Sequence, residues 1–260
     1  RENPYAGLFL DMGLGKTIIT LTELEWMLYQ DLTVNRPLII GPKRVIQSVW
    51  KQEAEKWAHT RKLKVSIVWG TVKERIAALR APADIYLINR ENVVWLVGLF
   101  QSKWPFDMVI VDESSSFKSH ASQRFKALKT VRPYINRLLL LTGTPAPNGL
   151  LDLWSQIYLL DQGVRLEKNI SGYRSRYFLI EQIDGHIARK YTPRKEAVDV
   201  IHHKISDLCI SMKTDDYLNL PEIIINDIKL DLPKYIKDQY NEFEREQVMQ
   251  MLDVEITALS

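Results

Sequence analysis

The chain has 260 residues, of which 46% are hydrophobic and 26% charged, and its formal net charge is +3. This composition is typical of a globular protein, contains no apolar run of the roughly 20 residues that a membrane span needs, and does not by itself require a nucleic-acid partner. The single cysteine, Cys209, excludes an intrachain disulfide and a cysteine metal cluster, and we expect it to be a small buried side chain. Since no signal peptide is visible, we expect a cytoplasmic protein of bacterial or phage type, or a nuclear protein, without a membrane partner.

A phosphate-binding loop is predicted near the start of the chain. Residues 5–10 are an apolar run of strand length, the string Asp-Met-Gly-Leu-Gly-Lys-Thr follows at 11–17, and a helical pattern opens at Ile18. Glycines let backbone N–H groups approach phosphates closely, and a helix N-terminus adds a partial positive charge. An ordinary glycine turn is the alternative, because Leu10 stands where the full pattern has a further glycine. We expect a nucleotide to contact Met12, Gly13, Leu14, Gly15, Lys16 and Thr17, with the Lys16 ammonium on the terminal phosphates and the Thr17 hydroxyl on Mg²⁺.

Short apolar runs and longer amphipathic stretches alternate through residue 160. Strand-like runs occupy 38–40, 65–69, 85–88, 108–111 and 138–141, and amphipathic stretches occupy 45–57, 72–79 and 122–131. Strands that are apolar throughout and separated by helices indicate a parallel sheet with both faces covered. The pattern therefore predicts an α/β fold with a mostly parallel sheet flanked by helices.

Two adjacent acids, Asp112 and Glu113, end the apolar run at 108–111. At the carboxyl edge of a parallel sheet such side chains face the ligand crevice, whereas buried unpaired carboxylates are costly. We expect Asp112 to hold the Mg²⁺ shell and Glu113 to orient and deprotonate the attacking water. The alternative is an acidic turn after a strand, with Ser114 as a helix cap.

The next apolar run ends in a turn with two threonines, Thr142-Gly143-Thr144. Their hydroxyl groups could sense the γ-phosphate and relay its state to the nucleic-acid side of the protein. A plain polar turn is the alternative. We include Thr142, Gly143 and Thr144 among the expected nucleotide contacts because the turn follows the other two motifs in this order.

The pattern changes after residue 160. Nine Lys and Arg residues stand against five acids between Arg165 and Lys204, and we expect a basic helical insertion with an irregular tip at 185–193. Residues 223–230 then favour a strand, and Pro233 is suited to the first turn of a helix. A second basic stretch, residues 43–75, carries nine Lys and Arg residues against three Glu. Either stretch could be a solvated face or a surface that follows nucleic-acid phosphates.

Taken in order, these motifs resemble the Swi/Snf-type translocases of double-stranded DNA in helicase superfamily two. The resemblance rests on Asp-Met-Gly-Leu-Gly-Lys-Thr at 11–17, Asp-Glu at 112–113 and Leu-Thr-Gly-Thr-Pro at 141–145, with Asn148 and Asp-Leu-Trp at 152–154. It covers most of residues 5–160 and continues more loosely to Tyr240. It implies a RecA-like ATP-binding lobe at 1–160, a helical insertion at 161–222, and a return strand and long helix at 223–260 leading towards a second lobe.

The resemblance also implies the chemistry and the partners. ATP and Mg²⁺ would be the cofactors, Lys16 and Glu113 the catalytic residues, and Thr17 and Asp112 the metal-binding residues. Double-stranded DNA and a second RecA-like lobe would be the partners. The residues that match the family's nucleic-acid segments are Lys43, Arg44, Asn89, Arg90 and Lys118. Trp50 and Trp57 continue the first of these segments.

Four departures from the family pattern bear on function. Ser115 replaces a histidine in the acidic motif, and Ser211 and Met212 stand where basic residues are expected before Lys213. No glutamine-bearing adenine segment precedes the loop, and the arginine fingers of the second lobe are expected beyond residue 260. Two alternative functions stay open. One is a strand-separating or RNA helicase of the same superfamily, and the other is a nucleotide-dependent binding module that does not hydrolyse the nucleotide.

Overall fold

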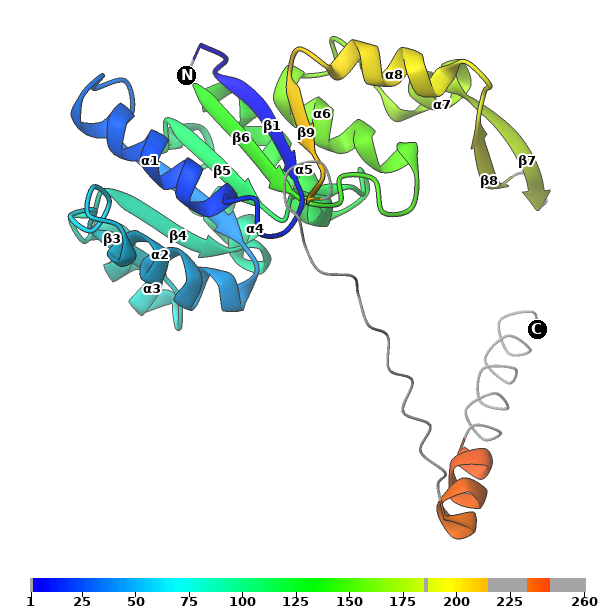
Figure 1. The fold of residues 1–260 in the computed structure, drawn as a ribbon, viewed down its shortest axis with the longest axis horizontal. Coiled ribbons are helices and arrows are strands. Elements are labelled where there is room, and N and C mark those ends of the chain that lie inside the picture. Colours follow the sequence, from blue (N-terminus) through cyan, green and yellow to red (C-terminus); the bar gives the residue numbers. More distant parts are fainter. Residues whose placement is uncertain (1, 185–186, 215–232, 244–260) are drawn as a thin grey trace. The chain divides into compact units, whose positions relative to one another are not determined.

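The computed structural model describes residues 2–184, 187–214 and 233–243. Helices and strands alternate along most of this length (Figure 1). In chain order they are β1 (Tyr5–Leu10), α1 (Lys16–Tyr29), β2 (Pro37–Gly41), α2 (Trp50–Lys56), β3 (Val65–Val68), α3 (Val72–Arg80), β4 (Ile85–Asn89), α4 (Val93–Phe100), β5 (Met108–Asp112), α5 (Gln123–Val131), β6 (Arg137–Thr142), α6 (Leu153–Asp161), α7 (Ile170–Tyr177), β7 (Phe178–Asp184), β8 (Ile187–Pro193), α8 (Ala197–Ile205) and β9 (Cys209–Met212).

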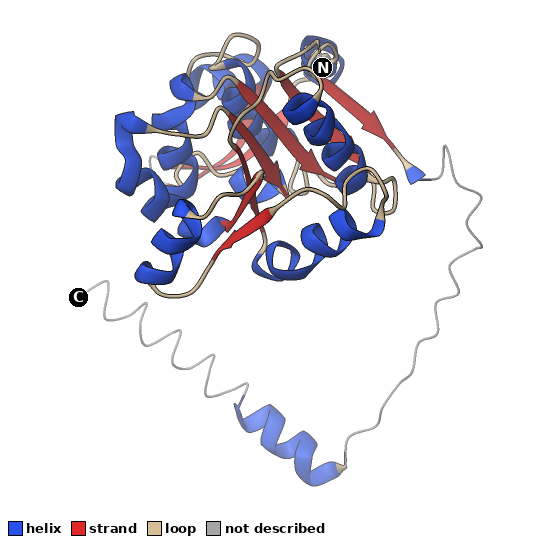
Figure 2. Ribbon diagram, turned by 90° about the vertical axis from the view of Figure 1, so that its left-hand side faces the viewer, coloured by secondary structure: helices blue, strands red, loops and turns tan. Residues whose placement is uncertain are grey.

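Seven strands form one sheet in the order β3-β4-β2-β5-β6-β1-β9, and all of its strand pairs are parallel. Parallel neighbours need crossover connections, which the intervening helices provide. Figure 2 shows the strands between helices on both sides. The predicted α/β fold with a mostly parallel sheet flanked by helices is thereby confirmed. Because every strand runs in the same direction, the loops that follow the strands gather at one edge, here called the carboxyl edge.

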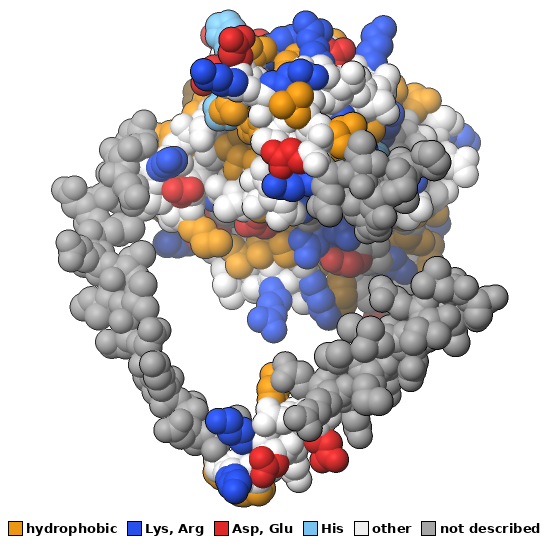
Figure 3. Space-filling model, turned by 90° about the vertical axis from the view of Figure 1, so that its right-hand side faces the viewer, with side chains coloured by type: hydrophobic (Ala, Val, Ile, Leu, Met, Phe, Trp, Pro, Cys, Tyr) orange, Lys and Arg blue, Asp and Glu red, His pale blue; other side chains and the backbone are white. Residues whose placement is uncertain are grey.

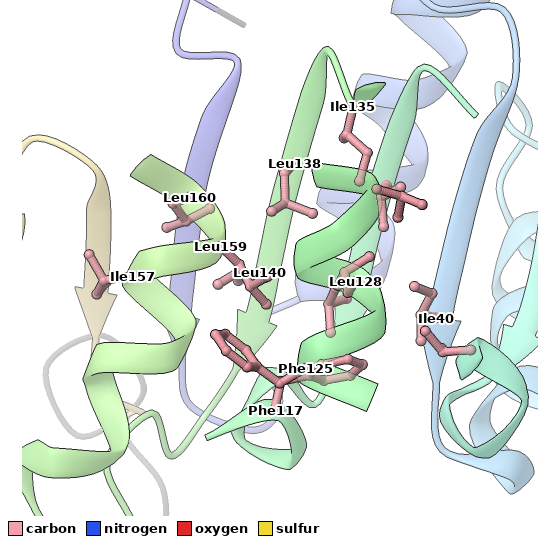
Figure 4. Close-up of a cluster of buried hydrophobic side chains, with 14 of the residues drawn as sticks. Ile40, Phe117, Phe125, Leu128, Ile135, Leu138, Leu140, Ile157, Leu159 and Leu160 are labelled. Atoms are coloured by element: carbon pink, nitrogen blue, oxygen red, sulfur yellow. The ribbon is translucent and has the colours of Figure 1, made fainter. Parts of the chain in front are cut away.

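The core consists of two hydrophobic clusters, one on each face of the sheet. Along β2, Leu38 and Ile40 pack in one cluster and Ile39 in the other, as the two-residue repeat of a strand requires. Helices α1 and α2 contribute to the Ile39 cluster, whereas α3 to α8 contribute to the other. Figure 4 shows part of the cluster that contains Leu38 and Ile40, where Phe117 and Phe125 lie among leucines of the neighbouring strand and helices. Burial on both faces explains why the strands are continuous apolar runs in the sequence.

The segment after residue 160, expected to be a helical insertion, contains strands as well as helices, and residues 187–193 of its expected irregular tip form β8. Helices α7 and α8 flank an antiparallel hairpin of β7 and β8, and β9 joins the main sheet beside β1, with Gly7 opposite Cys209. An Asp-Gly dipeptide at 184–185 is the sequence signal for such a hairpin. Strand β9 has only four residues and lies at the sheet edge, so its sequence carries little periodicity. The division of the chain at residues 160 and 222 stays a prediction.

The chain separates into two compact units, Arg1–Leu218 and Asn219–Ser260. In the second unit, residues 234–243 are helical and begin directly after Pro233, as predicted. The predicted strand at 223–230 lies outside the described residues. Within the described ranges, no helix is both long enough and apolar enough to cross a membrane.

Candidate functional site

The predicted phosphate loop connects β1 to α1 at the carboxyl edge. Gly13 and Gly15 adopt left-handed backbone conformations, with φ of +85° and +74°, which glycine adopts without steric cost. Gly15 directly precedes α1, and in the described chain no side chain caps the first turn of this helix. The N–H groups of that turn therefore form the kind of helix N-terminus at which anions bind.

Lys16 is folded back across the loop. Its Nζ donates hydrogen bonds to the carbonyl oxygens of Leu10 at 2.6 Å and Asp11 at 3.0 Å. Thr17 and Leu14 are half-buried, whereas the Met12 side chain is 82% exposed. The ammonium group thus lies against the strand end, within the loop that the sequence predicts.

The acidic pair stands at the end of β5, two strands away from β1 in the sheet. Asp112 is buried at 8% exposure, and its Oδ1 accepts a 3.0 Å hydrogen bond from the backbone N–H of Glu113. Burial raises the pKa of Asp112 above its ordinary value, while a hydrogen bond from Trp50 and the charge of Lys16 oppose the rise. Glu113 is half-buried and has a left-handed backbone with φ of +52°, a conformation that is uncommon for a residue with a Cβ.

Strand β6 lies between β1 and β5 and brings the third motif to the same place. Thr142 pairs with Phe9 of β1, and Leu141 pairs with Asp112 of β5. A Cβ added to Gly143 would lie 3.4 Å from the carbonyl oxygen of Leu10, so this turn passes close to the phosphate loop. Thr142 is fully buried, and its Oγ1 accepts a 3.1 Å hydrogen bond from the backbone N–H of Thr144. The three predicted motifs therefore meet at the ends of three adjacent strands.

The predicted nucleic-acid residues also lie at or after the ends of strands at the carboxyl edge, but their environments differ. Lys43 and Arg44 are exposed after β2, and the Lys43 Nζ lies 4.5 Å from the ring centroid of Trp69, which follows β3. Lys118 forms an ion pair of 3.3 Å with Asp152. These three cations lie at or near the surface.

Asn89 and Arg90 are held by local interactions. Asn89 is only 4% exposed, and its side-chain amide bonds to both Glu91 and Asn92. Arg90 donates a 3.0 Å hydrogen bond to Glu91. The amide of Asn89 thus fixes the turn after β4 within the protein, and its predicted contact with nucleic acid stays a prediction.

Two buried residues contact the acidic motif although the sequence does not assign them to the nucleotide site. Trp50 is expected in a nucleic-acid segment, but it is 1% exposed and bonds to Asp112. Gln156 of α6 is fully buried and bonds to Ser114 beside the acidic pair. No local pattern could identify them, because each contacts a motif more than 40 residues away along the chain.

Comparison with known proteins places the chain in a family. The family model of the SNF2-related domain matches residues 2–258. Protein p41 of Acyrthosiphon pisum secondary endosymbiont phage 1 is 37% identical over 266 residues, which cover 100% of this chain and 57% of that protein. Helicase ssl-1 of Caenorhabditis elegans is 35% identical over 166 residues, 61% of this chain and 7% of the helicase. The chain thus spans little more than half of the phage protein and a small part of the helicase.

A solved structure has the same fold. The Sulfolobus solfataricus SWI2/SNF2 ATPase core in complex with dsDNA superimposes with a TM-score of 0.64 at 22% sequence identity, covering 81% of this chain and 40% of that one. The fold is therefore the RecA-like fold of SWI2/SNF2 ATPase cores. The family match over nearly the whole chain agrees with the resemblance that the motifs suggest. The chain belongs to the SNF2-related domain family.

Proposed function

We propose that this chain is the ATP-binding lobe of a duplex-DNA-dependent ATPase, which moves along DNA in the complete protein. The observation that carries the proposal is the meeting of Lys16, the Asp112–Glu113 pair and the turn at 142–144 at the ends of adjacent parallel strands. Such a crevice at the carboxyl ends of strands is where ligands bind in open α/β sheets. Relatives named as ATP-dependent helicases, such as one from Mycoplasma pneumoniae that is 38% identical over 156 residues, support ATP as the ligand.

The residues at this crevice suit magnesium-bound ATP. The N–H groups of the loop and of the first turn of α1 would bind phosphate oxygens, and Lys16 would turn from its carbonyl partners to the terminal phosphates. The Thr17 hydroxyl and the Asp112 carboxylate are hard oxygen donors of the kind that Mg²⁺ prefers. Mg²⁺ usually completes its shell with phosphates and water, so two protein ligands are enough to hold it here. When bound, the ion would neutralise charge on the transferred phosphoryl group.

Glu113 is suited to act on the attacking water. It is more exposed than the buried Asp112 next to it, and Asp112 has both carboxylate oxygens bonded within the protein. Asp112 would therefore stay with the metal while Glu113 accepts the proton that water loses during attack on the γ-phosphorus.

Duplex DNA is the proposed polymer partner. The exposed Lys43 and Arg44 lie at the same edge of the sheet as the nucleotide crevice, and the insertion adds further Lys and Arg residues. Figure 3 shows basic side chains over one face of the molecule, interleaved with acidic and hydrophobic ones. The Sulfolobus structure with the same fold is a complex with dsDNA. A second RecA-like lobe would supply the arginine fingers, which can contribute roughly 10³–10⁵ in rate in such ATPases.

A paired turnover assay tests this proposal. We expect the natural full-length protein to hydrolyse ATP faster with duplex DNA than without it, and residues 1–260 alone to bind nucleotide weakly and hydrolyse almost none. Robust DNA-stimulated hydrolysis by residues 1–260 would contradict the two-lobe arrangement. Triplex displacement without strand displacement would distinguish a translocase from a strand-separating helicase. A full-length protein that binds ATP without any turnover would instead be a binding module.

A further inference from the structure

A buried glutamine in α6 holds two of the three motifs together. Gln156 and Ser114 are both 0% exposed. The Oε1 of Gln156 accepts a 2.8 Å hydrogen bond from the Ser114 hydroxyl, and its Nε2 donates to the carbonyl oxygens of Pro145 at 2.6 Å and Asp152 at 3.0 Å. Because Nε2 faces two carbonyl acceptors and Oε1 faces a hydroxyl that can donate, both ends of the amide are satisfied in one orientation only.

The bonds of Gln156 connect the two turns beyond the ends of β5 and β6. Ser114 directly follows Glu113 and begins a short 3₁₀ turn, Ser114–Phe117. Pro145 directly follows the turn at 142–144. The backbone pairing of the two strands ends at Asp112 and Leu141, so past this point the side chain of Gln156 provides a direct link between them.

A second branch leads from Gln156 to a predicted nucleic-acid contact. Asp152, whose carbonyl oxygen accepts from Gln156, uses its carboxylate to accept a 2.9 Å hydrogen bond from the backbone N–H of Asn148. The same carboxylate oxygen pairs with the Nζ of Lys118 at 3.3 Å. Lys118 remains partly accessible, with 30% of its side chain exposed. Contacts therefore run from a surface cation to the residue that follows Glu113.

We propose that Gln156 is a positioning residue that couples nucleic-acid contact at Lys118 and the third motif to the placement of Glu113. The inference rests on the proposed function. A DNA phosphate that binds the Lys118 ammonium competes with the Asp152 carboxylate for it. The Asp152 carboxylate then loses part of the positive charge that faces it. Since a buried polar group is costly to leave without a partner, the turns bonded to Gln156 shift together with α6. Glu113 then follows Ser114 into the position in which it orients water.

The test compares variants of the natural full-length protein in ATP turnover with and without duplex DNA. Gln156→Met keeps the length of the side chain and removes its hydrogen bonds. We expect its DNA stimulation of kcat to fall about tenfold, which corresponds to the loss of about 1.4 kcal/mol of transition-state stabilisation. Its KM for ATP and its DNA affinity should change little. Gln123→Met is the matched control, because Gln123 is exposed at the start of α5.

Two double variants distinguish coupling from a merely structural role. In Ser114→Ala/Gln156→Met both partners of one buried bond are apolar, so stability should partly recover while DNA stimulation stays low. In Lys118→Ala/Gln156→Met the loss of stimulation should not exceed that of the larger single variant, because both residues act through one network. Normal DNA stimulation in Gln156→Met would overturn the inference. It would also be overturned if the Ser114→Ala/Gln156→Met variant recovered DNA stimulation together with stability. A wild-type protein without any DNA-stimulated turnover would instead overturn the proposed function itself, and the inference with it.

Discussion

The indole Nε1 of Trp50 donates a 2.9 Å hydrogen bond to the Oδ2 of Asp112. The two residues are 62 positions apart in the chain, in α2 and at the end of β5. With the backbone N–H of Glu113 on Oδ1, both oxygens of the buried carboxylate have a donor. The bond therefore links the helix after the basic Lys43–Arg44 segment to the proposed metal-binding residue.

Replacing Trp50 by Phe should lower the free energy of unfolding by about 1–3 kcal/mol at neutral pH, because a buried carboxylate loses a donor. Burial raises the pKa of Asp112 above its unfolded value, so ionisation of this group costs stability as the pH rises through the folded-state pKa. The difference between wild type and variant should consequently grow with rising pH and shrink once the carboxyl is protonated. Urea unfolding at several pH values measures it.

Trp57→Phe provides the matched control for this measurement. The Nε1 of Trp57 also donates to a carboxylate, that of Glu53 at 2.8 Å, but that bond is exposed. Its removal should cost less than about 0.5 kcal/mol, as for most surface substitutions. Equal losses of unfolding free energy in the two variants would mean that the buried bond to Asp112 stabilises the protein no more than an exposed one.

Nucleotide binding should depend on Lys16. Lys16→Ala removes a charge-assisted contact worth about 1.5–3 kcal/mol, so affinity for ATP with Mg²⁺ should fall roughly 10- to 150-fold. Isothermal titration calorimetry measures the change. Lys51→Ala is the control, since the ion pair of Lys51 with Glu55 lies at the surface. Unchanged affinity in Lys16→Ala would identify the loop as an ordinary turn.

Glu113→Gln should keep nucleotide binding and abolish turnover in the natural full-length protein. The amide retains the shape of the side chain but cannot accept a proton from water. Steady-state hydrolysis and ATP affinity are measured on the same preparation, with Glu55→Gln as a surface control. Normal hydrolysis by Glu113→Gln would remove this residue from the proposed mechanism.

DNA binding should be mainly electrostatic and nearly independent of sequence, because phosphate contacts carry little sequence information. Lys43→Ala should reduce the slope of log K against log salt by about 1. Lys129→Ala is the control, because Lys129 lies near the end of α5, which leads to the opposite edge of the sheet. Titrations at several salt concentrations with unrelated duplexes measure the slopes. A flat salt dependence, or a strong preference among the duplexes, would argue against the proposed surface.

Local sequence determined the elements and the motifs at their ends. Strands buried on both faces must be apolar throughout, as in Leu38–Ile40 and Val109–Val111, and this makes them visible in the sequence. Since parallel strands end at one edge, the motifs that follow them could be expected to lie together. The periodicity of 161–222 was less informative, because a hairpin and the short edge strand β9 bury less apolar surface than a central strand.

Only the tertiary structure decided which residues meet. The order β5-β6-β1 places the turn at 142–144 between the acidic pair and the phosphate loop, and strand order is set by how helices pack across the sheet. The bonds from Trp50 to Asp112 and from Ser114 to Gln156 join residues 62 and 42 positions apart. Their side chains have no common local pattern, and their partners follow from three-dimensional packing alone. Asn89 is likewise only 4% exposed, although its polar side chain gives no local sign of burial.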